Sequence, residues 1–462
     1  MKFVKYFVLT AALVGGFSSA VQAYGMGDTS PRAMSLGQSY TALARGPEAT
    51  FWNPANLALR SSPKFAWQIV DLGLTLVAEN NSFSVQTYND NFTEKDHFIS
   101  ADDKTDLLND IEGDGLKMNV DLDPYFSALV PINGGVAFSL PKEIRSALSL
   151  GFKAGFEGQV PKDMFELMLF GNKFDKQYDI AKWDGSSWAL LSFNWAFAKA
   201  IMPKQLKKHL SEFTVGGTFK VIGGGYAEVL RSDGGFITQI EGAELDAYVL
   251  AQSGIGTGFG LDLGAAGVTK NGKTTVSVAL LNFLDTMSWS MYARQDSVFA
   301  SADDLRGTRM LDSDVKSIED VLDNEDVDGD GDKDFHEKIS EESFSRSLPA
   351  ILRIGAAHKV MPRLTVVGNY DQAFSDGFGI SSTPRLSGGA EYRLVPWFPT
   401  RMGLTLGGRS SGSSVGLAFG PFNFPHGRIQ LFDLALVTRG GFFPGIAKGT
   451  AISINFFKLE IR

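Results

Sequence analysis

The sequence of 462 residues contains no cysteine. Disulfide scaffolds, thiol catalysis and cysteine-ligated zinc or iron–sulfur sites are therefore excluded. A lipoprotein anchor is excluded as well, because it requires a cysteine directly after a signal cleavage site. Histidine is scarce, and the five present, at positions 97, 209, 336, 358 and 426, show no H-x-x-H or H-E-x-x-H spacing. Zinc-protease chemistry is therefore not expected.

Long apolar runs are also lacking. Beyond the first 23 residues, no segment reaches the roughly 18 uninterrupted apolar residues that mark a membrane-spanning helix. The formal net charge is −9 and the isoelectric point is near 5.2. Because nucleic-acid binding requires a basic face, no nucleic-acid partner is expected.

Residues 1–23 have the three-part form of a secretory signal peptide. Lys2 and Lys5 supply its positive charge, residues 7–17 form an apolar core, and residues 21–23 provide a small-residue cleavage site. The apolar core is too short for a spanning helix. We therefore expect the chain to be exported and the mature protein to begin directly after this segment.

From about residue 64 onward, the sequence has the alternation of β-strands between clusters of Gly, Asn, Asp, Ser and Pro. The clearest hairpin joins residues 259–265 to residues 274–280 through Asn271-Gly272, a dipeptide that favours tight turns. One face of each strand is bulky and apolar, and the other is mostly small or polar. The apolar face would meet a second sheet in a soluble sandwich and lipid in an outer-membrane barrel. Alternation alone does not separate the two folds.

Three features favour the barrel. The signal peptide directs export, the 51 glycines suit bent strands and a crowded lumen, and the 36 phenylalanines suit a lipid-facing band with aromatic girdles. We predict an all-β fold in which residues 63–462 form a transmembrane antiparallel β-barrel. The expected location is the outer membrane of a Gram-negative type of envelope, with outer-membrane lipid around the barrel.

Two short helices are expected between the strands. Residues 105–111 carry Thr105 at the capping position, and residues 161–170 begin with Pro161. The second helix is apolar almost all round, so it must be buried or lie against lipid. We interpret it as a loop helix packed on the barrel rim.

Two catalytic patterns match the sequence by letter only. Gly267–Thr274 fits the phosphate-binding pattern G-x-x-x-x-G-K-[ST], but the residues after it alternate as in a strand instead of opening a helix. Residues 408–412 and 412–416 fit G-x-S-x-G, yet they lie between two alternating strands. Both patterns are interpreted as turns, and the protein is not expected to be an enzyme.

An acidic segment, residues 297–346, interrupts the strand rhythm and is too long for a periplasmic turn, so an extracellular loop is expected. Within it, residues 326–337 match the calcium-loop pattern D-x-[DN]-x-[DN]-G-x₅-E at every position. The alternative is an acidic, solvated loop without an ion. We expect a structural Ca²⁺ because the pattern supplies six oxygen ligands, from Asp326, Asp328, Asp330, Asp332, Asp334 and Glu337.

The segment before the strands is rich in small residues, such as Gly37, Ala42 and Gly46, which allow backbone to pack closely in a confined space. Pro54 fixes its own φ and restricts Asn53 to extended geometry. This segment resembles the N-terminal region of the FadL-like outer-membrane superfamily, which includes transporters of long-chain fatty acids and aromatic hydrocarbons. Other sequence details are nearer to uncharacterised relatives, so no ligand-binding residue is carried over.

The resemblance implies a barrel of about 14 strands with both termini in the periplasm. It also implies that residues 24–62 form a hatch inside the barrel lumen. A passive plug and a ligand-responsive gate are both consistent with the sequence. The candidate hatch residues are Gly37, Tyr40, Ala42, Gly46, Pro47, Trp52, Asn53, Pro54 and Ala55.

The first functional hypothesis is passive uptake or export of hydrophobic small molecules such as long-chain fatty acids. A hatch that fills the lumen would block free aqueous flow, which disfavours a non-selective porin. The alternative is a structural or secretion-associated barrel that engages an external or periplasmic partner. The sequence does not identify such a protein partner.

Replacing Asp326 by Asn and Glu337 by Gln removes the two carboxylates that the pattern requires at its first and last positions, so Ca²⁺ binding should be lost. Calorimetric titration of the purified protein with CaCl₂ measures the effect. The pair Asp102→Asn and Asp103→Asn removes the same charge outside the motif and should leave binding unchanged. Equal calcium binding by both double variants and the parent protein would contradict the assignment.

Overall fold

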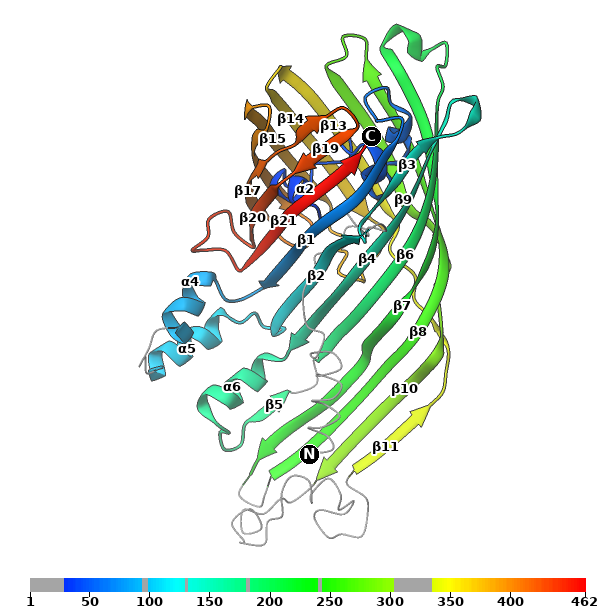
Figure 1. The fold of residues 1–462 in the computed structure, drawn as a ribbon. Coiled ribbons are helices and arrows are strands. Elements are labelled where there is room, and N and C mark those ends of the chain that lie inside the picture. The colour runs from blue at the N-terminus through cyan, green and yellow to red at the C-terminus, as the bar shows by residue number, and fades with distance from the viewer. Residues whose placement is uncertain (1–28, 94–98, 129–131, 180–182, 240–242, 303–334) are drawn as a thin grey trace.

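The computed structural model describes residues 29–93, 99–128, 132–179, 183–239, 243–302 and 335–462. They form a closed antiparallel β-barrel of 14 strands, with a few short helices (Figure 1). The fold predicted from the sequence is thereby confirmed. The expected signal peptide lies outside the described residues. Among the residues described, no helix combines the length and apolarity required to cross a bilayer.

Several barrel strands are interrupted, so two or three labelled elements follow one another along a single strand. One short strand, β5 (Gln177–Asp179), pairs with β7 beyond the start of β6 and in the same register as β6. Around the barrel the elements are β1 (Ala66–Asn80), β2 (Leu116–Ala128) with β3 (Gly134–Ser139), β4 (Ile144–Val160), β6 (Asp184–Ala200), β7 (Leu210–Thr238), β8 (Ala243–Thr269), β9 (Thr274–Asp285) with β10 (Ser288–Ala302), β11 (Phe335–Ser340) with β12 (Phe344–Ser345) and β13 (Ile351–Met361), β14 (Leu364–Ala373), β15 (Arg385–Val395), β16 (Phe398–Gly407), β17 (Gly412–Phe419) with β18 (Phe422–Phe424), β19 (Gly427–Gln430) with β20 (Phe432–Arg439), and β21 (Gly449–Ile461).

The barrel closes where the first strand meets the last. β1 pairs with β21 in an antiparallel ladder that includes Leu74 opposite Ile454. Closure leaves no free edge in this wall, as lipid requires of a spanning sheet.

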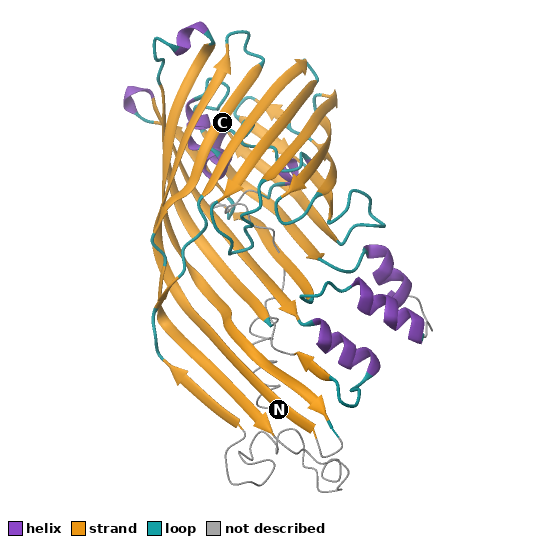
Figure 2. Ribbon diagram, turned by 180° about the vertical axis from the view of Figure 1, so that it is seen from behind, coloured by secondary structure: helices purple, strands orange, loops and turns teal. Residues whose placement is uncertain are grey.

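The wall is much taller on one side than on the other (Figure 2). β7 has 29 residues and β8 has 27, whereas β17 and β20 have 8 each. A spanning strand needs only about 9–11 residues. The long strands therefore continue well beyond the membrane and form a projecting wall.

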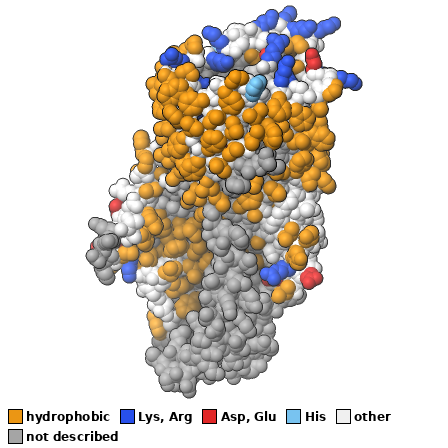
Figure 3. All heavy atoms as spheres, in the orientation of Figure 1, with side chains coloured by type: hydrophobic (Ala, Val, Ile, Leu, Met, Phe, Trp, Pro, Cys, Tyr) orange, Lys and Arg blue, Asp and Glu red, His pale blue; other side chains and the backbone are white. Residues whose placement is uncertain are grey.

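The outer face of the barrel is an apolar belt, visible as a wide hydrophobic band in Figure 3. On β6, Leu191, Phe193 and Trp195 are exposed, whereas the alternating Ser192 and Asn194 are buried in the lumen. This is the pattern of a lipid-facing wall with a polar interior. On β16 the same exposed face carries Met402, Leu404 and Leu406.

Loop lengths differ at the two ends of the barrel. The end that holds the C-terminus has short turns, such as residues 270–273 and 396–397, while α4, α5, α6 and longer loops lie at the other end (Figure 1). Outer-membrane barrels have short periplasmic turns and longer external loops. We therefore name these the inner end and the outer end.

The helices of the outer end partly differ from the prediction. α4 (Val85–Tyr88) and a short π-helix (Asn89–Thr93) precede α5 (Ala101–Asp110). α5 begins earlier than expected, so Thr105 is not its cap. Ser100 caps the helix instead, through a reciprocal capping box with Asp103, which satisfies two backbone donors where Thr105 could satisfy one.

α6 (Lys162–Phe170) forms where it was predicted, with Pro161 at its N-cap. Its packing is unlike a core helix, because Glu166 is its only buried residue and the Met168 side chain is 76% exposed. Glu166 accepts a hydrogen bond from Lys173 Nζ at 2.8 Å. Hydrogen bonds from Lys173 and Lys176 hold the pKa of Glu166 below its usual value.

The strands also refine what was expected of the hairpin, the phosphate-loop pattern and the acidic segment. The predicted hairpin joins β8 to β9, but only Gly272 of the Asn271-Gly272 pair has a positive φ. The turn includes the last residues of the phosphate-loop pattern, and β9 follows it where a helix would be required. The acidic segment begins and ends as strand, because β10 pairs with β11 and Val298 lies opposite Glu337.

A positive charge on the apolar belt should destabilise the barrel. Leu404→Lys is expected to cost about 2–4 kcal/mol if the residue lies near the bilayer midplane. Urea unfolding in liposomes, followed by the shift of the unboiled band on gels, measures the change. Met168→Lys, on the exposed surface of α6 at the outer end, introduces the same charge and should shift stability by less than about 0.5 kcal/mol. Equal effects would contradict a lipid-facing belt.

Candidate functional site

Residues 29–62, called here the hatch segment, lie within the barrel near its inner end (Figure 1). The segment contains α2 (Pro31–Ser35), η1 (Gly46–Glu48), α3 (Ala49–Trp52) and η2 (Pro54–Ala58). α2 packs against β16, β17, β20 and β21, whereas η2 packs against β4, β6, β7 and β8. Because these strands belong to opposite walls, the hatch segment crosses the lumen.

Glycines on the inner face of the wall make room for the hatch segment. A Cβ at Gly403 would collide with the backbone of Leu36 and Gly37, and a Cβ at Gly264 would collide with the Asn53 side chain. Gly37 itself has φ +63°, a conformation that favours glycine. Further wall glycines that touch the segment in the same way are Gly216, Gly355, Gly389 and Gly416.

Asn53 ties the segment to the wall between β8 and β9. Its Nδ2 donates to the carbonyls of Ala265 and Val278 at 3.0 and 3.1 Å. Its Oδ1 accepts from the N–H of Ala55 at 3.0 Å and caps η2. One buried amide therefore fixes both the local turn and its position in the barrel.

Trp52 packs against a buried cation from the wall. The Arg353 guanidinium lies 4.5 Å from the centroid of the Trp52 ring, and the Tyr40 ring meets Trp52 edge-on at 5.5 Å. Arg353 and Arg385 both approach Asp371, Arg353 Nε at 3.6 Å and Arg385 Nε at 3.0 Å. Charges this deeply buried are tolerated when they are paired.

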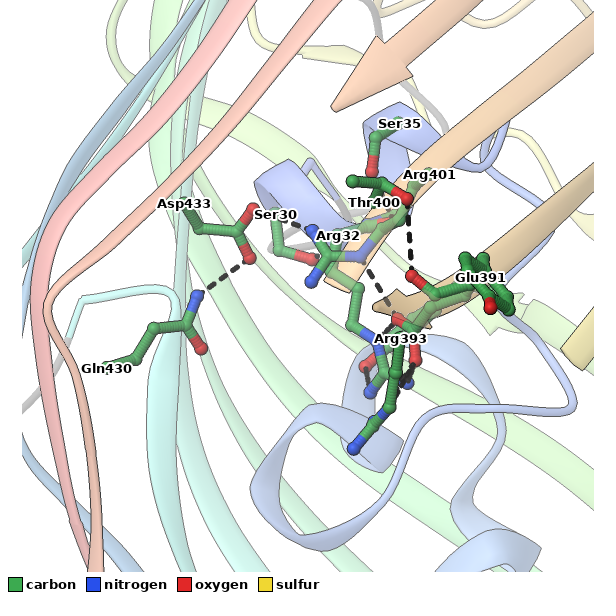
Figure 4. A network of polar contacts seen from close by, with 12 residues as sticks. Ser30, Arg32, Ser35, Glu391, Arg393, Thr400, Arg401, Gln430 and Asp433 are labelled. Atoms are coloured by element: carbon green, nitrogen blue, oxygen red, sulfur yellow. Dashed lines mark hydrogen bonds and ion pairs between the residues drawn. The ribbon is translucent and has the colours of Figure 1, made fainter. Parts of the chain in front are cut away.

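A second network of charges joins α2 to the wall (Figure 4). Arg32 Nε lies 2.8 Å from Glu391 Oε2. The same Glu391 oxygen accepts from Arg401 Nε at 3.0 Å, and Arg401 Nη1 donates to Asp433 Oδ1 at 2.6 Å. Gln430 completes the network by donating to Asp433 at 2.7 Å. The network locks the start of the hatch segment to β15, β16 and β20.

Glu48 forms a third link. Its carboxylate accepts from the Tyr40 hydroxyl at 2.7 Å and lies 3.0 Å from Lys458 Nζ of β21. Burial raises the pKa of Glu48, but the charges of Lys458 and Arg428 and the hydrogen bond from Tyr40 outweigh it and lower the pKa to about 2. Glu48 therefore stays ionised in the folded protein at neutral pH.

The structure buries all nine candidate hatch residues named from the sequence. It also shows residues that sequence analysis missed, above all Arg32, Arg353, Arg385 and Asp371. The sequence does mark the last three, because each is a charged residue within an alternating strand, on the face that is otherwise small and polar. Their partners in the hatch segment could not be inferred from spacing.

On the outer side of the hatch segment, an aromatic cluster occupies the lumen. Tyr226 lies with its ring centroid 4.8 Å from Phe378 and 5.3 Å from Trp289. Trp188 meets Phe378 edge-on at 6.0 Å, and Phe344 stacks on Trp289 at 6.0 Å. We call these five residues the aromatic cluster; no local pattern along the chain joins them.

Two cavities adjoin the aromatic cluster. An open cavity of about 1050 Å³ is lined by segments of β4, β6, β7, β8, β10 and β11 and includes Trp188 and Tyr226. A second cavity of about 20 Å³ reaches from Phe378 to Thr50 and Phe51 of the hatch segment. The second holds about one water. The cluster thus separates a roomy outer compartment from a nearly filled inner one.

The described residues offer no group of three or more His, Asp or Glu side chains that could hold a metal ion. Of the expected calcium ligands, Asp326, Asp328, Asp330, Asp332 and Asp334 lie outside the described residues. Glu337 lies in β11, a strand instead of the helix that follows an EF-hand loop.

Residues 58–252 and 236–432 match a family of unknown function, DUF5723. The chain belongs to this family. A search of curated protein sequences found no match. The barrel is also similar to solved structures, among them a Pseudomonas aeruginosa FadL homologue, with 11% identity over 96% of this chain and 98% of the other and a TM-score of 0.47.

The Pseudomonas putida toluene transporter TodX is similar to the same extent, with 11% identity over 96% of this chain and 99% of the other and a TM-score of 0.47. Both scores lie below 0.5, so the assignment of the barrel rests on its own strand pairing.

The depressed pKa of Glu48 predicts acid sensitivity. Its contribution to stability is complete above the ordinary carboxyl pKa of 4.5 and is lost as pH falls toward about 2. Glu48→Gln should lower the free energy of unfolding at pH 7 by roughly 1–3 kcal/mol. It should also make Tm fall less steeply between pH 5 and pH 3. Glu143→Gln, on an exposed turn, serves as the control. If Tm fell with pH equally in Glu48→Gln and in the parent protein, the acid sensitivity would not come from Glu48.

Proposed function

We propose that this protein admits hydrophobic small molecules across the outer membrane, by passive movement along a path that the hatch segment closes. The observation that carries the proposal is the aromatic cluster between the open cavity of about 1050 Å³ and the hatch segment. Apolar and aromatic linings with a few polar groups are typical of small-molecule sites.

The contents of the lumen support selective rather than free passage. The hatch segment is held by Arg32–Glu391, by Arg353 against Trp52 and by the Asn53 amide. The inner cavity of about 20 Å³ is too small for a hydrated ion or a sugar. Passage therefore requires a ligand that binds the cluster and a movement of groups around it.

The polar groups near the cluster favour amphiphilic ligands. Lys220 pairs with Asp262 at 2.7 Å and, with Asn194 and Asn282, lines the inner cavity beside the apolar Ile222 and Leu348. A long-chain fatty acid could place its tail among the rings while its head group met these side chains. We propose fatty acids as the first ligands to test, with aromatic hydrocarbons beside them.

We also propose that Ca²⁺ orders the acidic loop at the outer end. The proposal rests on the motif at residues 326–337 and gives the ion a structural role. It is independent of the ligand path.

Removing a ring from the cluster should weaken ligand binding. One aromatic contact contributes about 0.5–1.5 kcal/mol beyond its buried area, so Trp188→Ala should raise the Kd for oleate or toluene about tenfold. Calorimetric titration of detergent-solubilised protein measures Kd. Trp397→Ala, at the inner rim beside Phe419 and Phe422, is the matched control.

Uptake into liposomes tests passage directly. Vesicles that contain the protein should take up a fluorescent fatty acid faster than empty vesicles. In planar bilayers the protein should show low ohmic conductance. No binding across a broad panel of apolar ligands would reject the transport function. Large conductance would instead support an open pore.

A further inference from the structure

The inner end carries a concentration of unpaired cations that the ligand path does not use. The β6–β7 and β8–β9 turns lie side by side, because the N–H of Lys270 donates to the carbonyl of His209 at 3.2 Å. Their exposed lysines are Lys199, Lys204, Lys207, Lys208, Lys270 and Lys273.

The neighbouring β13–β14 turn extends this surface. The N–H of Lys359 donates to the carbonyl of Lys273 at 2.9 Å, and Arg363 follows in the same turn. We call the lysines of the first two turns, with Lys359 and Arg363, the cationic arc. Across the described part of the chain, no member of the arc forms an ion pair with a carboxylate. Glu212, on β7 beside the first turn, instead lies 3.7 Å from Arg60.

The charge of the arc contrasts with that of the whole chain, whose formal net charge is −9. Like charges held on adjoining turns repel one another, and the repulsion falls when an anion binds between them. Nothing in the fold of these turns requires lysine, since their side chains are exposed. The arc therefore has the properties of an anion-binding surface.

The position of the arc identifies the anion. On β6 the outward-facing series Leu191, Phe193 and Trp195 continues with Phe197 and then Lys199. The cations thus begin where the lipid-facing belt ends, and Figure 3 shows Lys and Arg gathered along the rim above the apolar band. Lysine at this depth can bury its methylenes along apolar surface and place its ammonium among head groups.

We propose that the cationic arc binds anionic phospholipid head groups of the inner leaflet of the outer membrane. The arc follows the circumference of the barrel over three successive turns, as a ring of lipids does, instead of forming one compact face as a protein partner would require. It holds lipid beside the inner ends of β6, β7 and β8, the strands that form the tall wall. This proposal is independent of what passes through the lumen.

The test counts lipids on the purified full-length protein by native mass spectrometry. The parent should retain more dioctanoyl phosphatidylglycerol than dioctanoyl phosphatidylcholine, and 300 mM salt should reduce the excess. The triple variant Lys204→Gln, Lys207→Gln and Lys208→Gln should lose at least half of the excess. The corresponding triple change to Arg should keep it.

A matched control removes three positive charges from the outer end, by Lys104→Gln, Lys117→Gln and Arg231→Gln, and should retain the full excess. A shifted band on unboiled gels shows that each variant has folded, and an unchanged affinity for toluene, which carries no charge, separates lipid binding from the ligand path. Equal retention of the two lipids by the parent overturns the proposal. An unchanged excess in the glutamine variant also overturns it.

Discussion

Hydrogen bonding of the backbone within lipid is the constraint on which the rest of this structure depends. The hydrocarbon region offers no water to an exposed N–H or C=O, so a spanning sheet must close on itself. The ladder between β1 and β21 provides that closure. Once the sheet is closed, each strand has one face toward lipid and one toward the lumen, which explains the alternation of Leu191 and Phe193 with Ser192 and Asn194.

Closure also creates an interior that must be filled. The hatch segment fills it near the inner end, and wall glycines such as Gly264 and Gly403 permit its backbone to approach. Buried charges then connect segment and wall, with Arg353 over Trp52 and Arg32 on Glu391. Each of these cations would be costly without its partner. The same contacts that stabilise the lumen therefore also determine whether anything can pass through it.

The two ends of the barrel have different chemistry. At the outer end the long strands β7 and β8 continue past the membrane and, with the aromatic cluster, border an open cavity. At the inner end short turns carry the exposed lysines of the cationic arc. The proposed uptake of apolar molecules and the proposed attachment to anionic lipid therefore involve separate surfaces of one wall, joined by strands that run between them.

The sequence by itself determined the barrel, the burial of the small residues around Trp52 and Asn53, and the β8–β9 turn. The strands and the turn follow from local period and turn chemistry, which act over a few residues, whereas the barrel was favoured by the export signal and the composition, and the hatch by the family resemblance. It misplaced the cap of α5, although Ser100 and Asp103 have the local spacing of a capping box. Only the tertiary structure decided that Arg353 meets Trp52 and that Trp188, Tyr226 and Phe378 form one cluster. Closure of the sheet brings such distant residues together, and no spacing along the chain encodes which inward-facing side chains then meet.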